Sequence, residues 1–268
     1  MKKFLKSTLS AAIMILSCFG ISKGYAQDQK QSPDIDYEIM VQRATQAAIW
    51  GMPAAGMIDF EKATKRDLKG DVNDVIYVSK PFASRHGFLT ANDVTPYAWG
   101  SLSTVKGPLV VEVPAANDKV GYFGTIVDAW DVPLIDVGTT GHDKGKGGKY
   151  LILPPGYKDE TPKGYVVLPC NTFNQGFSFR PVMKDGATFE DTTAYAKTLK
   201  IYQLADAANP PATRHIDAFP SSYGSLPTYD LSFFEDIHAV LLHDRRQGDA
   251  AVLGGQEVVC VGLCGRSG

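Results

Sequence analysis

A group of acidic, basic and aromatic residues in the middle of the chain has the chemistry to bind or activate a small molecule. The group consists of Asn92, Asp93, Tyr97, Trp99, Asp128, Trp130, Asp131, Asp136 and Arg180. A guanidinium fork binds carboxylate, sulfate or phosphate groups, and a nearby carboxylate can act as a general base. A functional interpretation therefore makes Arg180 the anchor of an anionic group and Asp128 or Asp131 the general base or a metal ligand. The ligand-binding residues are then Asn92, Asp93, Tyr97, Trp99 and Trp130.

The same residue types also fit a structural role. Buried arginine and aspartate side chains are mostly paired, and unpaired ones are costly. Arg180 and Asp128 can therefore form an ion pair at the mouth of a folded domain, with the aromatic side chains in its core. Both interpretations stay open at the level of the sequence.

The sequence lacks the common motifs that indicate a particular reaction. It contains no Gly-x-Ser-x-Gly elbow, His-Glu-x-x-His pair, Cys-x-x-Cys pair or dinucleotide fingerprint. The glycine-rich stretch 138–149 has Asp143 where a phosphate-binding loop needs glycine, and Tyr150 where it needs serine or threonine. We expect this stretch to be a mobile connection between strands. No cofactor is expected, and the sequence leaves open whether the protein is an enzyme.

The cysteine and histidine residues give little support for a metal site. Cys170 lies in a β-like segment and is expected to be a small buried residue, whereas Cys260 and Cys264 could form a disulfide in an oxidising compartment. His86 and His142 fall in loop-like stretches and could approach the acidic residues, but the sequence does not place them there. We therefore predict no metal site.

The residues of this group must be positioned mainly by β-strands. Runs with β-branched and aromatic residues, bounded by glycine and proline, lie at 75–78, 109–113, 121–128, 149–153, 165–168 and 176–180. Because these runs follow one another without helical segments between them, they favour antiparallel pairing over a parallel α/β sheet. The sequence predicts a mainly β fold, with an antiparallel β-sandwich or jelly-roll-like core.

Helices are expected at both ends of this core. An N-terminal arm over 34–50 carries a stripe of apolar residues that we expect to be buried: Tyr37, Met40, Val41, Ala44, Ala47 and Ala48. Gly51-Met52-Pro53 should interrupt the arm, which resumes over 54–65. Residues 206–230 look irregular because they are rich in proline.

Two further helices are expected downstream of the strands. A short helix over 188–196 can be capped by Thr188 or Asp185. A C-terminal helix over 230–243 should bury Phe233, Ile237, Val240 and Leu241, with Ser232 as its cap and Glu235 returning the contact.

The start of the chain indicates export. Residues 1–26 combine lysines near the start, an apolar stretch over 9–21 and small residues before a cleavage point after Ala26. Cys18 faintly resembles a lipoprotein site, but the apolar stretch continues past it, so cleavage after Ala26 is favoured. The full chain has a formal charge of -2, and loss of the signal lysines makes it about -6. This charge argues against nucleic acid or anionic membranes as partners.

The predicted organisation has one folded domain. The signal peptide is followed by a linker over 27–36, a single sandwich domain over 37–249 and an atypical tail over 250–268. The abrupt change of composition after Asp249 suggests that the tail is a truncation scar or an out-of-frame end rather than a native element.

Several motifs together resemble the secreted bacterial family called domain of unknown function 1254. The motifs are Ala47–Pro53, Thr90–Trp99, Gly107–Pro114, Gly147–Gly156 and Ser232–Ile237. The resemblance covers roughly residues 37–245 and implies a β-sandwich with helical additions. It also implies a second β-rich domain, number 1214 in the same scheme, which we expect to be absent or truncated here.

One motif of this family is only partly kept. The family's Thr-Pro-Asn-x-Asp-Thr-x-Tyr pattern matches this chain at Thr90, Asn92, Thr95 and Tyr97. Ala91 stands in place of the proline and Val94 in place of the aspartate. A function that needs the family's carboxylate at this position therefore requires Asp93 to replace it.

Three functions remain from these observations. The first is a periplasmic or secreted module that binds a small amphipathic ligand, or that assembles with a companion β-rich domain or subunit. The alternative is a hydrolase or lyase for an anionic or ester-like small molecule, with Arg180 orienting it and Asp128 or Asp131 activating water. The third is a structural remnant without activity. No stable membrane insertion is expected after signal cleavage.

Overall fold

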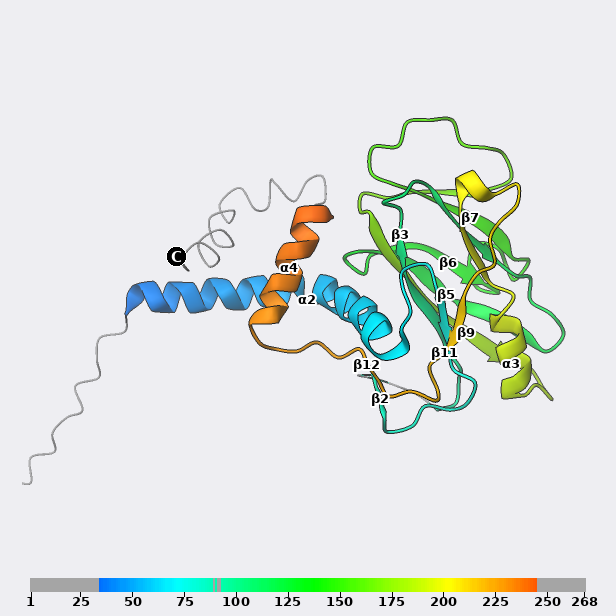
Figure 1. The fold of residues 1–268 in the computed structure, drawn as a ribbon, viewed down its shortest axis with the longest axis horizontal. Coiled ribbons are helices and arrows are strands. Elements are labelled where there is room, and N and C mark those ends of the chain that lie inside the picture. Colours follow the sequence, from blue (N-terminus) through cyan, green and yellow to red (C-terminus); the bar gives the residue numbers. More distant parts are fainter. Residues whose placement is uncertain (1–33, 89, 91–92, 245–268) are drawn as a thin grey trace, which may run out of the picture. The chain divides into compact units, whose positions relative to one another are not determined.

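A computed structural model describes residues 34–88, 90 and 93–244 (Figure 1). The chain divides into two compact units, Met1–Thr45 and Gln46–Gly268. The predicted signal peptide, the linker up to residue 33, Asn92 and the tail over 250–268 lie outside the described residues.

The described part of the first unit is the beginning of helix α2, which covers Ile35–Leu68. Asp34 caps this helix: its carboxylate accepts hydrogen bonds from the backbone N–H groups of Asp36 (3.1 Å) and Tyr37 (3.3 Å). The expected burial of the apolar stripe is wrong here, since Tyr37, Met40 and Val41 are 57%, 44% and 40% exposed. The stripe has helical spacing, but these side chains face solvent.

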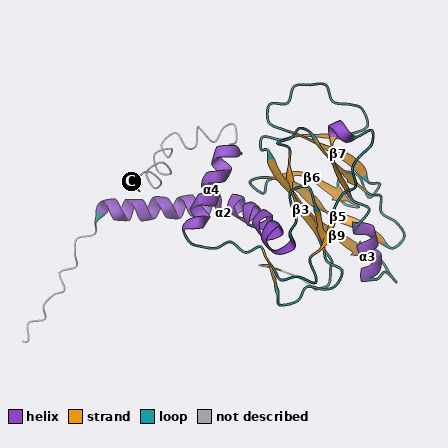
Figure 2. Cartoon of the chain, viewed as in Figure 1, coloured by secondary structure: helices purple, strands orange, loops and turns teal. Residues whose placement is uncertain are grey.

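The second unit is built around two sheets (Figure 2). The larger sheet has the order β11 (His215–Asp217), β1 (Val75–Tyr77), β3 (Ala98–Ser103), β9 (Asn174–Met183), β5 (Val120–Asp128) and β6 (Pro133–Gly138). The smaller has the order β10 (Lys200–Gln203), β4 (Leu109–Val113), β7 (Gly148–Leu153) and β8 (Val166–Pro169). A short pair joins β12 (Tyr223–Gly224) to β2 (His86–Gly87). The mainly β sandwich and its helices at both ends are confirmed.

The main core lies between these two sheets. Alternating residues of each strand point inward, so Val111 and Ile152 of the smaller sheet pack with Tyr122 and Phe179 of the larger one, all fully buried. The intervening residues face outward. The outer face of the larger sheet is therefore lined by a separate set of side chains.

The strand pairing differs from the prediction in two respects. Three pairs are parallel, β1 with β11, β7 with β8 and β2 with β12, within the sandwich for which the sequence favoured antiparallel pairing. Residues 206–230, predicted to be irregular, contain β11 and β12. Strands of two or three residues are too short to produce a period of two, and long-range pairing determines them.

The short helix and the C-terminal helix have well-defined starts. Helix α3 (Phe189–Ala196) is capped by Thr188, whose hydroxyl and Asp191 form a reciprocal capping box, while a single 3-10 turn, η1, covers Leu204–Asp206. Helix α4 (Leu231–His243) is capped by Asp230, which accepts from the N–H of Ser232 at 2.8 Å. The predicted Ser232 cap is wrong because this carboxylate stands two residues earlier.

Helix α2 continues through Pro53, so the predicted interruption is also wrong. In the second unit α4 crosses α2 at Gly51, where an added Cβ would lie 2.4 Å from Cδ1 of Ile237 (Figure 1). Phe233 and Ile237 of α4 are buried, as predicted, and they pack with Ala55 of α2. Within the described part of the chain, no helix is long and apolar enough to cross a bilayer.

Two glycines of α2 predict opposite effects of the same substitution. Gly51→Ala should lower the free energy of unfolding by about 1–2 kcal/mol, because the new methyl group overlaps Ile237. Gly56→Ala should raise it by about 0.5–1 kcal/mol, because nothing lies within 4 Å of the added Cβ and alanine favours the helix. Urea unfolding of both variants measures this difference, and equal signs would contradict the packing described.

The glycine-rich connection between β6 and β7 is organised by one carboxylate. Asp143 accepts hydrogen bonds from the backbone N–H of Gly138 (2.6 Å) and Gly147 (2.9 Å) and from the hydroxyl of Tyr150 (3.1 Å). The stretch is thus a strand connection, as predicted. Its backbone N–H groups at Gly138 and Gly147 donate to Asp143 of the same loop.

Candidate functional site

The candidate site lies on the outer face of the larger sheet, opposite the main core. The register pairs Arg180 of β9 with Phe123 of β5, and the guanidinium of Arg180 lies 4.8 Å from the ring centre of Tyr97, just before β3. Directly opposite residues of antiparallel strands point to the same face. Tyr97, Arg180 and Phe123 therefore form one row across three strands.

A second row lies two residues further along each strand. It consists of Trp99 on β3, Ser178 on β9, Thr125 on β5 and Asp136 on β6. The hydroxyl of Thr125 donates to Oδ1 of Asp136 at 2.6 Å, which confirms that their side chains share this face. Ser178 and Asp136 are exposed, whereas Trp99 is buried.

The open part of this face combines one cation with apolar surface. Phe123 is 50% exposed, and Val182, two residues beyond Arg180, is 46% exposed. Within residues 34–88, 90 and 93–244, Arg180 forms no ion pair. A half-buried guanidinium in this setting can bind an anionic group while Phe123 contacts an apolar body.

Helix α2 borders the open area on one side. Met57 of α2 reaches the next row of the sheet, where its Cε would lie 2.5 Å from a Cβ added at Gly176. Further along the helix, Phe60 packs with Trp99 and Tyr223 in an aromatic cluster. The helix thus covers Gly176 and Trp99, whereas Ser178 and Phe123 stay exposed.

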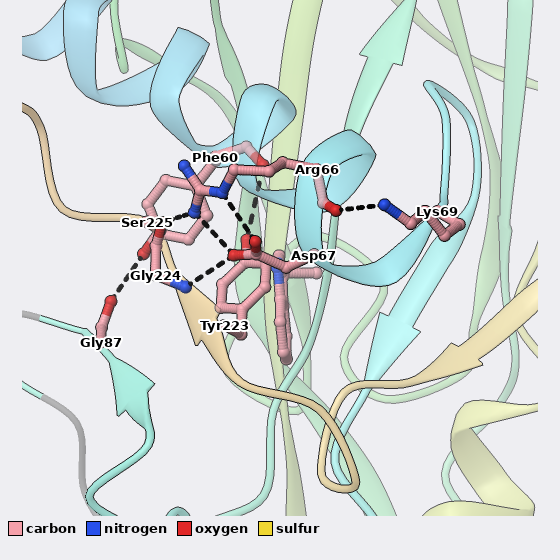
Figure 3. Close-up of polar contacts among 9 residues, drawn as sticks. Phe60, Arg66, Asp67, Lys69, Gly87, Tyr223, Gly224 and Ser225 are labelled. Atoms are coloured by element: carbon pink, nitrogen blue, oxygen red, sulfur yellow. Dashed lines mark hydrogen bonds and ion pairs between the residues drawn. The ribbon is translucent and has the colours of Figure 1, made fainter.

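The end of α2 is fixed by a polar cluster (Figure 3). Arg66 donates to the carboxylate of Asp67 with two hydrogen bonds of 2.6 Å and to the carbonyl of Gly224 at 2.8 Å, while the N–H of Gly224 donates back to Asp67 at 3.1 Å. The Arg66 hydrogen bonds hold the pKa of Asp67 below its usual value.

Trp99 and Tyr223 continue this cluster into the core. The indole N–H of Trp99 donates to the hydroxyl of Tyr223 at 3.2 Å, and burial raises the pKa of Tyr223 to about 12. Trp99 therefore links the outer face of β3 to the aromatic cluster that packs with Phe60 of α2.

The structure does not bring Asp128 and Arg180 together. Asp128 pairs with Gln175 near one end of β9, whereas Arg180 pairs with Phe123 near the other, about 17 Å along the strand. Asp128 is buried, and its Oδ1 accepts from the backbone N–H of Trp130 (2.8 Å) and Val132 (3.0 Å). The alternatives of a shared site and of an Arg180–Asp128 ion pair therefore both lack the required geometry.

The other residues of the Asp128 turn are placed by the helices. Trp130 is buried with its ring 4.5 Å from that of Trp50, and its N–H donates to the carbonyl of Asp244 at 3.1 Å. Asp131 has a φ of 58° at the exposed tip. Partial desolvation of the Asp131 carboxylate and the nearby charge of Asp128 raise its pKa. Because the side chain is exposed, water screens much of this effect.

The role of Asp244 has no signal in the sequence. This carboxylate is buried and accepts hydrogen bonds from the backbone N–H groups of Phe173 and Asn174, and from the side-chain amide of Asn174 at 2.6 Å. It thereby joins the end of α4 to the start of β9. An acid at the end of a helix predicts a surface position, so only the tertiary fold reveals this contact.

The remaining candidates have local roles or no described contact. His86 is buried; its Nδ1 accepts from the N–H of Ala83 at 2.8 Å and its Nε2 faces the carbonyl of Phe219 at 3.1 Å. Cys170 is buried, as predicted. Asp93 is exposed in the loop before Tyr97. Within the described ranges no three histidine, cysteine or acidic residues could hold a metal ion together.

Comparison with solved structures supports the fold. The crystal structure of the VPA0106 protein from Vibrio parahaemolyticus is similar with a TM-score of 0.56 and 16% sequence identity, over 84% of this chain and 51% of that chain. This chain thus spans about half the length of the Vibrio protein, and at this identity the likeness concerns the fold alone. No curated protein matches the chain.

A family match covers the strands that carry the candidate site. Residues 72–203 match the family described as protein of unknown function DUF1254. This range runs from just before β1 to the end of β10 and includes Tyr97, Phe123, Asp136 and Arg180. This match over residues 72–203 confirms the resemblance to the DUF1254 family that was inferred from the sequence motifs.

Proposed function

We propose that the protein is a binding module that holds a small amphipathic carboxylate on the outer face of its larger sheet. The observation that carries this proposal is Arg180, whose guanidinium lies on the ring of Tyr97 and forms no ion pair with a described residue. Exposed Phe123 stands directly beside it.

The chemistry of this row favours a carboxylate with an apolar body. Stacking on Tyr97 restrains the planar guanidinium and leaves its N–H edge to pair with a carboxylate by two parallel hydrogen bonds. Hydrogen bonds to charged groups contribute about 1.5–3 kcal/mol. Phe123 and Val182 can cover an alkyl or aromatic group. Because the face is open to water, we expect a dissociation constant of about 0.1–1 mM.

The alternative, a hydrolase or lyase, has less support. It requires Arg180 beside Asp128 or Asp131, and the register separates Arg180 from Asp128. The binding proposal needs only residues that share one face.

We also propose that this binding takes place in the periplasm or outside the cell. The signal-like pattern of residues 1–26 supports this location. A carboxylate bound there would come from the surroundings of the cell rather than from its cytoplasm.

Isothermal titration with octanoate tests the binding proposal. Arg180→Gln should weaken octanoate binding at least tenfold, because it removes the charge that pairs with the carboxylate. Lys163→Gln is the matched control: it removes one positive charge from an exposed position in the loop between β7 and β8 of the other sheet. This control should bind octanoate like the unchanged protein.

Two results would overturn the proposal. One is an unchanged protein that does not bind octanoate, and the other is an Arg180→Gln variant that binds it as well as the Lys163→Gln control. Thermal unfolding of each variant verifies that the comparison is between folded proteins.

A further inference from the structure

We infer that the ligand of this face is a zwitterion, with its carboxylate on Arg180 and an ammonium group on Asp136. This inference rests on the proposed function and specifies the second end of the same ligand. It arises from two opposite charges on one open face that are not paired with each other.

The register places both charges on one surface. Arg180 faces Phe123, and Asp136 faces Thr125 two residues along the same strand, β5. With strands about 4.8 Å apart and residues about 3.4 Å apart along each strand, the two Cα atoms are separated by about 12 Å. The guanidinium of Arg180 lies on Tyr97, on the side of β9 away from β6, so the two charges do not meet and a ligand can span them.

The carboxylate of Asp136 can accept a hydrogen bond from an ammonium group of such a ligand. Its Oδ1 accepts the hydroxyl of Thr125 at 2.6 Å, which fixes the carboxylate against β5. Its side chain is exposed, and within the described ranges it forms no ion pair. A second negative charge on the ligand would be repelled there, whereas an ammonium group would be attracted.

The surface between the two charges is apolar at its centre. Phe123, half exposed, lies on the strand between β9 and β6, and the methyl-bearing Thr125 follows on the same face. An extended ω-amino acid with eight carbons has its charged ends about 10 Å apart. 8-Aminooctanoate can therefore reach from Arg180 to Asp136 with its methylene chain on Phe123.

Titration with 8-aminooctanoate and octanoate tests this inference. The unchanged protein should bind 8-aminooctanoate at least fivefold more tightly than octanoate. Asp136→Asn should abolish this preference, so that the two ligands bind with equal affinity. Asp159→Asn, which removes an exposed carboxylate from the loop between β7 and β8, is the matched control and should keep the preference.

The outcomes separate this inference from the proposed function. If octanoate binds through Arg180 but 8-aminooctanoate binds no more tightly, the zwitterion is wrong and the carboxylate site stands. The inference is also wrong if Asp136→Asn keeps the preference. If neither ligand binds the unchanged protein, both the inference and the proposed function are wrong.

Discussion

Replacement of Asp244 with alanine is expected to lower the free energy of unfolding by about 3 kcal/mol or more. The carboxylate is 1% exposed and accepts from the backbone N–H groups of Phe173 and Asn174 and from the Asn174 side chain. Its removal leaves these donors without their acceptor, at a cost of about 1–3 kcal/mol for each one that stays buried. The end of α4 also loses its connection to the start of β9.

Asp230→Ala provides the control for this effect. Asp230 caps the opposite end of the same helix in an exposed position, so its loss should cost only about 1 kcal/mol. Urea unfolding followed by circular dichroism measures both. Equal losses would mean that Asp244 is no more than a helix-end residue, contrary to its described contacts.

Gly138→Ala is expected to be the most damaging of the glycine substitutions, with a loss of more than about 3 kcal/mol. Gly138 has a φ of +96°, and a Cβ added there would lie 1.8 Å from the carbonyl oxygen of Tyr122 on the paired strand. That oxygen belongs to the backbone of a central strand, so it cannot move aside without disturbing the β5–β6 ladder.

Gly164→Ala measures the cost of a positive φ without the close contact that Gly138 makes. Gly164 has nearly the same φ, +92°, but nothing lies within 4 Å of an added Cβ. Alanine there should cost only the strain of a left-handed conformation, about 1–2 kcal/mol. If thermal unfolding shows the two variants to be equally stable, the close approach of β6 to Tyr122 is wrong.

The sandwich was predictable because its longer strands carry their own signals. The run Leu109–Val113 lies between proline residues and appears as β4, and the predicted strands around Tyr122 and Phe179 appear as β5 and β9. Strand β11 was not predictable, because three residues contain no usable period and their position depends on pairing with β1.

The candidate site was only half predictable for a related reason. Tyr97, Arg180 and Asp136 were chosen by residue type, and the register does place them on one face. Phe123 and Ser178 were missed, because an exposed phenylalanine or serine has no signature until the opposite strand is known. Strand register is set by distant contacts, and a shift of one residue would reverse every side chain.

The acidic turn shows the opposite error. Two aspartates around Trp130 looked like the densest functional cluster of the chain, yet Asp128 binds the backbone of its own turn and Trp130 packs against the helices. Aspartate commonly satisfies local N–H groups in turns, and residue type alone does not distinguish this use from catalysis.

The most direct test of the central claim is to map where a carboxylate binds. In a nitrogen–proton correlation spectrum, octanoate should shift the backbone amides of Phe123, Ser178 and Arg180 and the side-chain Nε–H signal of Arg180. Amides of the turn at Asp131 should not respond. Shifts confined to that turn, or no saturable shifts at all, would contradict the assignment of the outer face as the binding site.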